Sequence, residues 1–166
     1  MGPSDWTEDP KLSAKLKAAA SWFASTATLG DLAVPARGGS AEPELTLRWC
    51  SCTHPAVAGE TPRQRLVLVQ GYTENFMKQI ELIKDLYEQL GVDVFAVDHR
   101  SQGLSGRVVW PESPDKAPDT QLVWVNSFED YVEDLLQFVE RVVLARHAPR
   151  RELLPSMARS TSPIQI

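Results

Sequence analysis

The order of apolar and polar positions predicts a helix at the start of the chain. Apolar side chains recur at helical spacing over residues of about 10 to 25, and serine and lysine side chains fall between them. The recurring positions are Leu12, Leu16, Ala19 and Phe23. The next stretch is interrupted by residues that favour turns, and we expect it to be a loop. These residues are Gly30, Pro35, Gly38, Gly39 and Pro43.

Two strands follow in the pattern. Leu45, Leu47 and Trp49 alternate with polar residues, which predicts a half-buried strand. Residues 66–69 are an unbroken apolar run, Leu-Val-Leu-Val. Such a run is typical of a strand buried on both faces of a parallel sheet.

A helix and a further strand come next. One apolar stripe at helical spacing runs from Phe76 to Leu90, and Gly91 stands where a C-terminal cap belongs. Residues 92–97 are again apolar and rich in β-branched side chains. Residues 66–97 therefore predict a strand, helix, strand unit with a right-handed crossover, and an α/β fold.

Ser127 begins the last predicted element. The sequence Ser-Phe-Glu-Asp at 127–130 resembles a capping box that opens a helix ending around Arg146. We expect its inward side chains to be Phe128, Tyr131, Leu135, Phe138, Val139 and Val142. Beyond Pro149 the pattern predicts no further helix or strand, so a sheet built from these strands alone would lack neighbours. We divide the chain into an N-terminal helix and loop (1–43), a partial α/β core (44–147) and an irregular C-terminal tail (148–166).

Composition excludes several classes of protein. The chain is 43% hydrophobic and 23% charged, which is ordinary for a folded domain. A net charge of −5 and a pI near 5.2 argue against nucleic acid as a partner. We find no signal peptide and no transmembrane segment, and two cysteines suit a reducing compartment. We expect a cytoplasmic protein, with a peripheral place at membranes left open.

The loops after the two apolar strands carry the candidate chemistry. They read Gln-Gly-Tyr-Thr-Glu-Asn at 70–75 and Asp-His-Arg-Ser-Gln-Gly-Leu-Ser-Gly-Arg at 98–107, and both lie at carboxyl ends of strands, where open α/β sheets bind ligands. Residues 45–143 resemble the serine α/β-hydrolases, and most closely their lysophospholipase and monoacylglycerol lipase branch. The first loop is similar to that family's His-Gly-x-x-Glu-His motif, and the second to its Asp-x-Arg-Gly-x-Gly-x-Ser motif.

The resemblance implies roles for residues in both loops. The Tyr72 amide would be one donor of an oxyanion hole, which stabilises charge on a carbonyl oxygen. The alternative is a helix-entry turn in which Gly71 only permits a tight bend. The other matching residues would be scaffold for the site, and they are Gly71, Glu74, Asp98, Arg100, Gly103 and Ser105. A second alternative is an anion nest between Arg100 and Arg107.

The sequence departs from the family pattern at three positions. Gln70 and Asn75 stand in place of the two histidines of the first motif, and Ser101 stands in place of a glycine. If Ser101 adopts a positive φ, this replacement costs about 1 kcal/mol.

The nucleophile motif of the family is absent from the sequence. No Gly-x-Ser-x-Gly pentapeptide occurs, and Ser156, after Leu-Leu-Pro, is a very weak candidate because it lacks both glycines. No Asp, Glu or His follows Ser156, although the fold delivers its acid and histidine after the serine. We assign no catalytic residue, and we interpret His99 and His147 as structural.

A metal site is a further alternative. Cys50, Cys52 and His54 alternate and could lie on one face of a strand, but such a site would need a fourth ligand. We expect neither a metal nor another cofactor.

Two functional hypotheses follow. The first is an α/β-hydrolase truncated before the nucleophile strand, inactive by itself, from a family that cleaves carboxylic esters of lipids. Whether this chain is an enzyme therefore stays open. The second is a non-catalytic binding or regulatory module that associates with itself or another chain through an exposed sheet edge.

Overall fold

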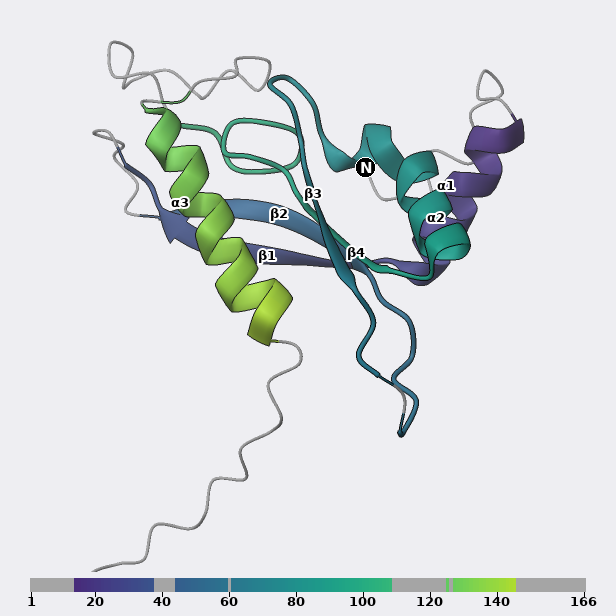
Figure 1. The fold of residues 1–166 in the computed structure, drawn as a ribbon. Coiled ribbons are helices and arrows are strands. Elements are labelled where there is room, and N and C mark those ends of the chain that lie inside the picture. Colours follow the sequence, from purple (N-terminus) through teal and green to yellow (C-terminus); the bar gives the residue numbers. More distant parts are fainter. Residues whose placement is uncertain (1–13, 38–43, 60, 109–124, 126, 146–166) are drawn as a thin grey trace, which may run out of the picture.

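The computed structural model describes residues 14–37, 44–59, 61–108, 125 and 127–145. Within these residues, one four-stranded sheet has helices on both faces (Figure 1). The strand order is β1-β2-β4-β3. The strands are β1 (Thr28–Pro35), β2 (Glu44–Cys52), β3 (Arg65–Val69) and β4 (Asp93–Val97). The helices are α1 (Ala14–Thr26), η2 (Phe76–Gln79), α2 (Ile80–Leu90), α3 (Phe128–Phe138) and the π-helical η3 (Val139–Leu144).

The predicted strand, helix, strand unit is confirmed. β3 and β4 pair in parallel, from Arg65 opposite Asp93 to Val69 opposite Val97, and α2 connects them. Gly91 ends α2 with a φ of 63°, the left-handed conformation that glycine adopts without strain. The α/β architecture read from the sequence is therefore correct.

Each face of the sheet has its own apolar core. On one face α1 and α2 cover the sheet, and Phe23 and Ile83 pack with Cys50 and Val94. On the other face Phe138 of α3 packs with Leu47, Trp49 and Phe95. No described helix combines the length and the apolar character needed to cross a membrane.

The predicted loop after the first helix is wrong in part, because residues 28–35 form β1. β1 pairs antiparallel with β2 along its whole length. Leu32 and Val34 point into the core and alternate with exposed residues, a pattern that the turn-favouring glycine and proline obscured. Gly30 is required because a Cβ there would lie 2.2 Å from the Trp49 ring, and Pro35 is tolerated at the end of an edge strand.

Two burial predictions are also wrong. β3 is half-buried rather than buried on both faces, since it is an edge strand of the described sheet, and Val69 is 54% exposed. Ser127 caps α3 as predicted, with its Oγ accepting the Glu129 amide, but Phe128 points outward and is 74% exposed. The inward face of α3 instead includes two carboxylates, Asp130 and Asp134.

Candidate functional site

The loop after β3 folds as a tight turn that leads into η2. The Glu74 amide donates to the Gly71 carbonyl at 3.1 Å, and Thr73 has a φ of 66°, which is unusual for a β-branched residue. Asn75, which replaces a histidine of the family motif, caps η2 by accepting the Lys78 amide at 3.1 Å. The turn leaves the Tyr72 side chain 60% exposed at the carboxyl end of β3.

Asp98 joins this turn to the loop after β4. One carboxylate oxygen accepts the Phe76 amide at 2.8 Å, and the other accepts the Leu104 amide at 2.9 Å. Burial raises the pKa of the Asp98 carboxyl to about 6, against these two hydrogen bonds, which lower it. The Asp98 carboxylate thus links the loop after β3 to the loop after β4.

Gly103 and Ser105 fit closely around Asp98. Gly103 has a φ of 49°, and a Cβ there would lie 2.0 Å from an Asp98 carboxylate oxygen. The Ser105 hydroxyl donates to the Asp98 carbonyl at 2.6 Å and accepts the Arg48 amide of β2 at 2.8 Å. Both residues therefore shape backbone, which is the kind of role that the resemblance implies for them.

Ser101 adopts the positive φ that its place in the motif suggested. Its φ is 60°, and its hydroxyl accepts the Val108 amide at 2.9 Å. This hydrogen bond, which glycine could not make, offsets part of the backbone strain.

Arg100 is completely buried in an ion pair that the sequence did not predict. Its Nε and Nη2 donate to the two carboxylate oxygens of Asp134 at 2.8 and 2.7 Å, and its Nη1 lies 3.4 Å from Asp130. These carboxylates fix the guanidinium, which disfavours the alternative of an anion nest at Arg100. The sequence shows two aspartates four residues apart in a predicted helix, but it does not show that they face inward.

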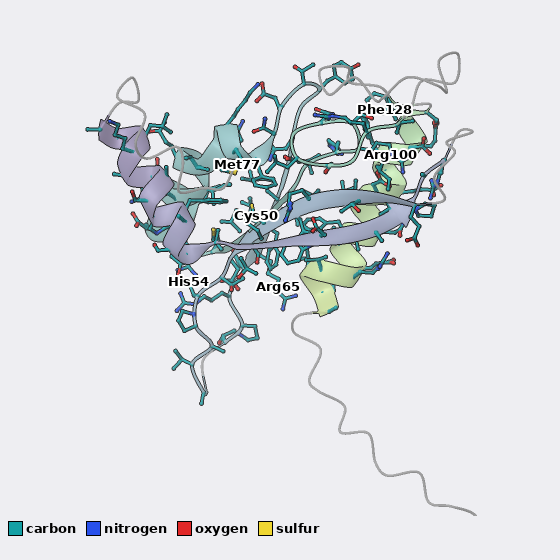
Figure 2. All side chains as sticks on the ribbon, turned by 180° about the vertical axis from the view of Figure 1, so that it is seen from behind. Cys50, His54, Arg65, Met77, Arg100 and Phe128 are labelled. Atoms are coloured by element: carbon teal, nitrogen blue, oxygen red, sulfur yellow. The ribbon has the colours of Figure 1, made fainter. Side chains whose placement is uncertain are left out.

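A cavity of about 270 Å³ lies at the carboxyl ends of β3 and β4. The loop residues Gly71 and Tyr72 form one side of it. Its wall is mainly apolar and comes from β3 and α3, and it consists of Val69, Phe128, Tyr131, Val132 and Leu135. In Figure 2 the labelled Phe128 and Arg100 lie at this end of the molecule, beside α3.

Polar side chains line the base of this cavity. Gln70, His99 and Gln102 are each more than nine-tenths buried. Gln102 Nε2 donates to the Tyr131 hydroxyl at 3.3 Å, and the His99 ring lies tilted by 38° against the Tyr131 ring, with centroids 4.6 Å apart. Burial lowers the pKa of His99, which favours the neutral ring.

Three buried polar atoms in this base have no hydrogen-bond partner within the described part of the chain. They are Gln70 Nε2, His99 Nδ1 and Gln102 Oε1. Buried polar atoms are nearly always paired, with water if not with protein. The cavity therefore combines an apolar wall with a base suited to a water molecule or a polar ligand group. Sequence analysis missed Gln102 and Tyr131 as lining residues, because Gln102 occupies a variable position of the second motif and Tyr131 lies outside both motifs.

Cys50, Cys52 and His54 do not assemble into a metal site. Both thiols are buried in the core, and burial raises the pKa of Cys52 to about 12, which disfavours a metal-binding thiolate. The His54 ring instead contacts the Asp93 carboxylate at 3.2 Å. Among the described residues no group of three or more His, Cys, Asp and Glu side chains could hold a metal ion. Ser156 and His147 lie outside the described residues.

Comparison with known proteins gives a consistent result. A family model described as serine aminopeptidase, S33 (Hydrolase_4) matches residues 60–157. Lysophospholipase L2 of Escherichia coli K12 is 41% identical over 78 residues, which are 47% of this chain and 20% of that protein. Probable lysophospholipase L2 of Haemophilus influenzae is 38% identical over 80 residues, which are 48% of this chain and 22% of that protein. The chain thus spans about a fifth of the length of these relatives. No solved structure gives a significant match.

Proposed function

The chain belongs to the S33 serine aminopeptidase family of α/β-hydrolases, in its lysophospholipase-like branch, and from this premise we propose that it forms the oxyanion-loop part of a lipid ester hydrolase. The main support for this proposal is that the Gly71–Tyr72 turn and the mainly apolar wall from α3 border the same cavity. The Tyr72 amide would donate to the carbonyl oxygen of a carboxylic ester as negative charge develops there.

The two surfaces of the cavity match the two parts of such a substrate. The acyl chain would lie against Val132 and Leu135, where its burial removes apolar surface from water. The ester end would lie over the polar base, where Gln70 Nε2 can donate and Gln102 Oε1 can accept a hydrogen bond. The relatives named lysophospholipase support a lysophospholipid as the substrate class.

Hydrolysis itself would require a nucleophile that these 166 residues do not offer. The sequence has no Gly-x-Ser-x-Gly pentapeptide, and the described residues that line the cavity include no serine. We expect the 166-residue chain to bind a lipid ester without turning it over, since the acyl-enzyme needs an activated serine.

Titration with a lysophosphatidylcholine below its micelle concentration tests binding. Amide resonances of Tyr72, Val132 and Leu135 should shift and saturate, and Val132→Asp should abolish the shifts because a charge replaces an apolar contact. Leu82→Asp is the matched control, since Leu82 is 44% exposed on α2 at the opposite face of the sheet. Equal loss in both variants would contradict the proposed site.

Labelling with a serine-reactive fluorophosphonate tests the absence of turnover. The purified chain should remain unlabelled and should leave a p-nitrophenyl ester intact. Labelling abolished by a single substitution, Ser156→Ala included, would contradict the proposal.

A binding module is the second candidate function, and the position of β3 favours it. β3 is an edge strand of the described sheet, its Val69 is more than half exposed, and the exposed Val132 of α3 lines the same cavity. Such an edge can pair with another chain or with a second copy. Size-exclusion chromatography with light scattering distinguishes the two, because a discrete dimer supports the module and a heterogeneous aggregate supports an incomplete hydrolase sheet.

A further inference from the structure

The polar base of the candidate cavity presents three hydrogen-bonding atoms that the described part of the chain leaves unpaired. They are Gln70 Nε2, His99 Nδ1 and Gln102 Oε1. Gln70 directly follows β3, whereas His99 and Gln102 belong to the loop after β4. The three side chains line the same cavity as the Gly71–Tyr72 turn. A ligand group that reaches this base therefore lies beside the amide that we place at the ester carbonyl.

His99 presents an acceptor to this base. Burial, the larger influence, lowers the pKa of His99 and favours the neutral ring, while a hydrogen bond to the Gln70 backbone raises the pKa. A hydrogen bond that raises the pKa of a histidine is one that the ring donates. Because Nδ1 is the unpaired atom, Nε2 is the donor to Gln70, and in the neutral ring Nδ1 then carries a lone pair.

Gln102 is held in place by a tyrosine of α3. Its Nε2 donates to the Tyr131 hydroxyl at 3.3 Å, which leaves Oε1 as an acceptor. Since a phenol hydroxyl both donates and accepts, the amide turned by 180° would also bond to Tyr131 and would present Nε2 instead. In either orientation Gln102 therefore offers one polar atom to a ligand.

A hydroxyl group suits this set of atoms better than the other polar groups of a lipid. A hydroxyl donates one hydrogen bond and also accepts, so it can pair with an acceptor and with Gln70 Nε2 at once. An ester carbonyl only accepts, and would leave the lone pairs of His99 and Gln102 unpaired. A phosphate oxygen would face those lone pairs with its own negative charge.

Resting on the lipid ester binding proposed above, we propose that His99 and Gln102 are specificity-determining residues that accept a hydrogen bond from a free hydroxyl beside the ester of the substrate. Gln70 Nε2 donates to the oxygen of the same hydroxyl. A lysophospholipid carries such a hydroxyl on its glycerol. An analogue without it leaves buried polar atoms unpaired, which is the basis on which a polar site rejects a ligand.

A pair of ligands tests the subsite on the unsubstituted 166-residue chain. Titrations followed by nuclear magnetic resonance would compare a short-chain lysophosphatidylcholine, below its micelle concentration, with the analogue in which hydrogen replaces the glycerol hydroxyl. The analogue should bind about tenfold more weakly. Equal affinity for the two ligands overturns the subsite and leaves lipid ester binding standing. No saturable binding of either ligand overturns both.

Matched glutamine variants test the residue assignment. Gln102→Met removes the polar atom but keeps a side chain of similar length, so it should abolish the preference for the hydroxyl ligand and leave affinity for the analogue nearly unchanged. Gln89→Met should keep the full preference, because Gln89 is exposed on α2 at the opposite face of the sheet. A preference that survives Gln102→Met overturns the assignment. If Gln102→Met loses both ligands through unfolding, the comparison on the unsubstituted chain decides.

Discussion

At the scale of single residues, the fit of Gly103 around Asp98 predicts a large effect of one methyl group. Gly103→Ala combines a positive φ with a contact of 2.0 Å to a buried carboxylate oxygen, so we expect a loss of about 3 kcal/mol in unfolding free energy. Gly59→Ala is the matched control. Gly59 has a φ of 85° but nothing within 4 Å of its Cβ position, so we expect a loss of about 1 kcal/mol. Urea unfolding measures both, and equal losses would contradict the packing account.

The raised pKa of Asp98 predicts a pH dependence of stability. Burial raises this pKa to about 6, against an ordinary value of 3.8, so between these values the folded chain holds a proton that the unfolded chain has released. Stability from this group is therefore present at low pH and is lost as the pH rises from about 4 to 6. The difference in unfolding free energy between the parent and Asp98→Asn should change across that window, by roughly 3 kcal/mol at most. A constant difference would contradict the raised pKa.

Some features of single residues could be predicted from the sequence, and others could not. Ser101 at a positive φ was predictable, because it occupies a glycine position of a motif. The ion pair of Arg100 with Asp134 was not, since the partners are 34 residues apart and either could equally have faced water. The cavity base was also missed, because no local pattern reports that His99, Gln102 and Tyr131 meet.

At the scale of elements, the Arg100–Asp134 pair joins the loop after β4 to α3. Removal of one partner leaves a buried charge, so Arg100→Leu should cost about 3–5 kcal/mol. The double variant Arg100→Leu with Asp134→Leu should recover much of that loss, because the only buried carboxylate left from this cluster is Asp130, which Arg37 also approaches at 3.5 Å. Thermal unfolding of the single and double variants measures this. A double variant no more stable than Arg100→Leu would show that the pair is not what joins the two elements.

The helices and the parallel strands were predictable because each follows a single pattern of apolar residues along its length. α2 shows a clear apolar stripe with a glycine cap, and β4 is apolar after its first residue, Asp93. β1 was missed because only Leu32 and Val34 carry its alternation, and the glycine that signalled a loop is there to make room for Trp49. The edge position of β3 depends on which strands pair, which the run of apolar residues does not encode.

At the scale of the whole molecule, the described sheet has an apolar edge at β3. A lysine on an edge strand disfavours pairing with another chain, so Val69→Lys should reduce self-association. Leu82→Lys on the opposite face is the control and should leave association unchanged. Sedimentation velocity over a range of concentrations measures both variants. Unchanged association of Val69→Lys would mean that the edge of β3 is not the contact surface.

The contact between Gly30 and Trp49 has a consequence for how this protein can vary. The indole ring occupies the space where any side chain on residue 30 would begin, so each position sets the size allowed at the other. We expect homologous chains to keep glycine opposite tryptophan and to regain a side chain on β1 only where the facing residue on β2 has become small. Substitutions at residues 30 and 49 should therefore be coupled. A double variant with a larger residue 30 and a smaller residue 49 should be more stable than a variant that enlarges residue 30 alone.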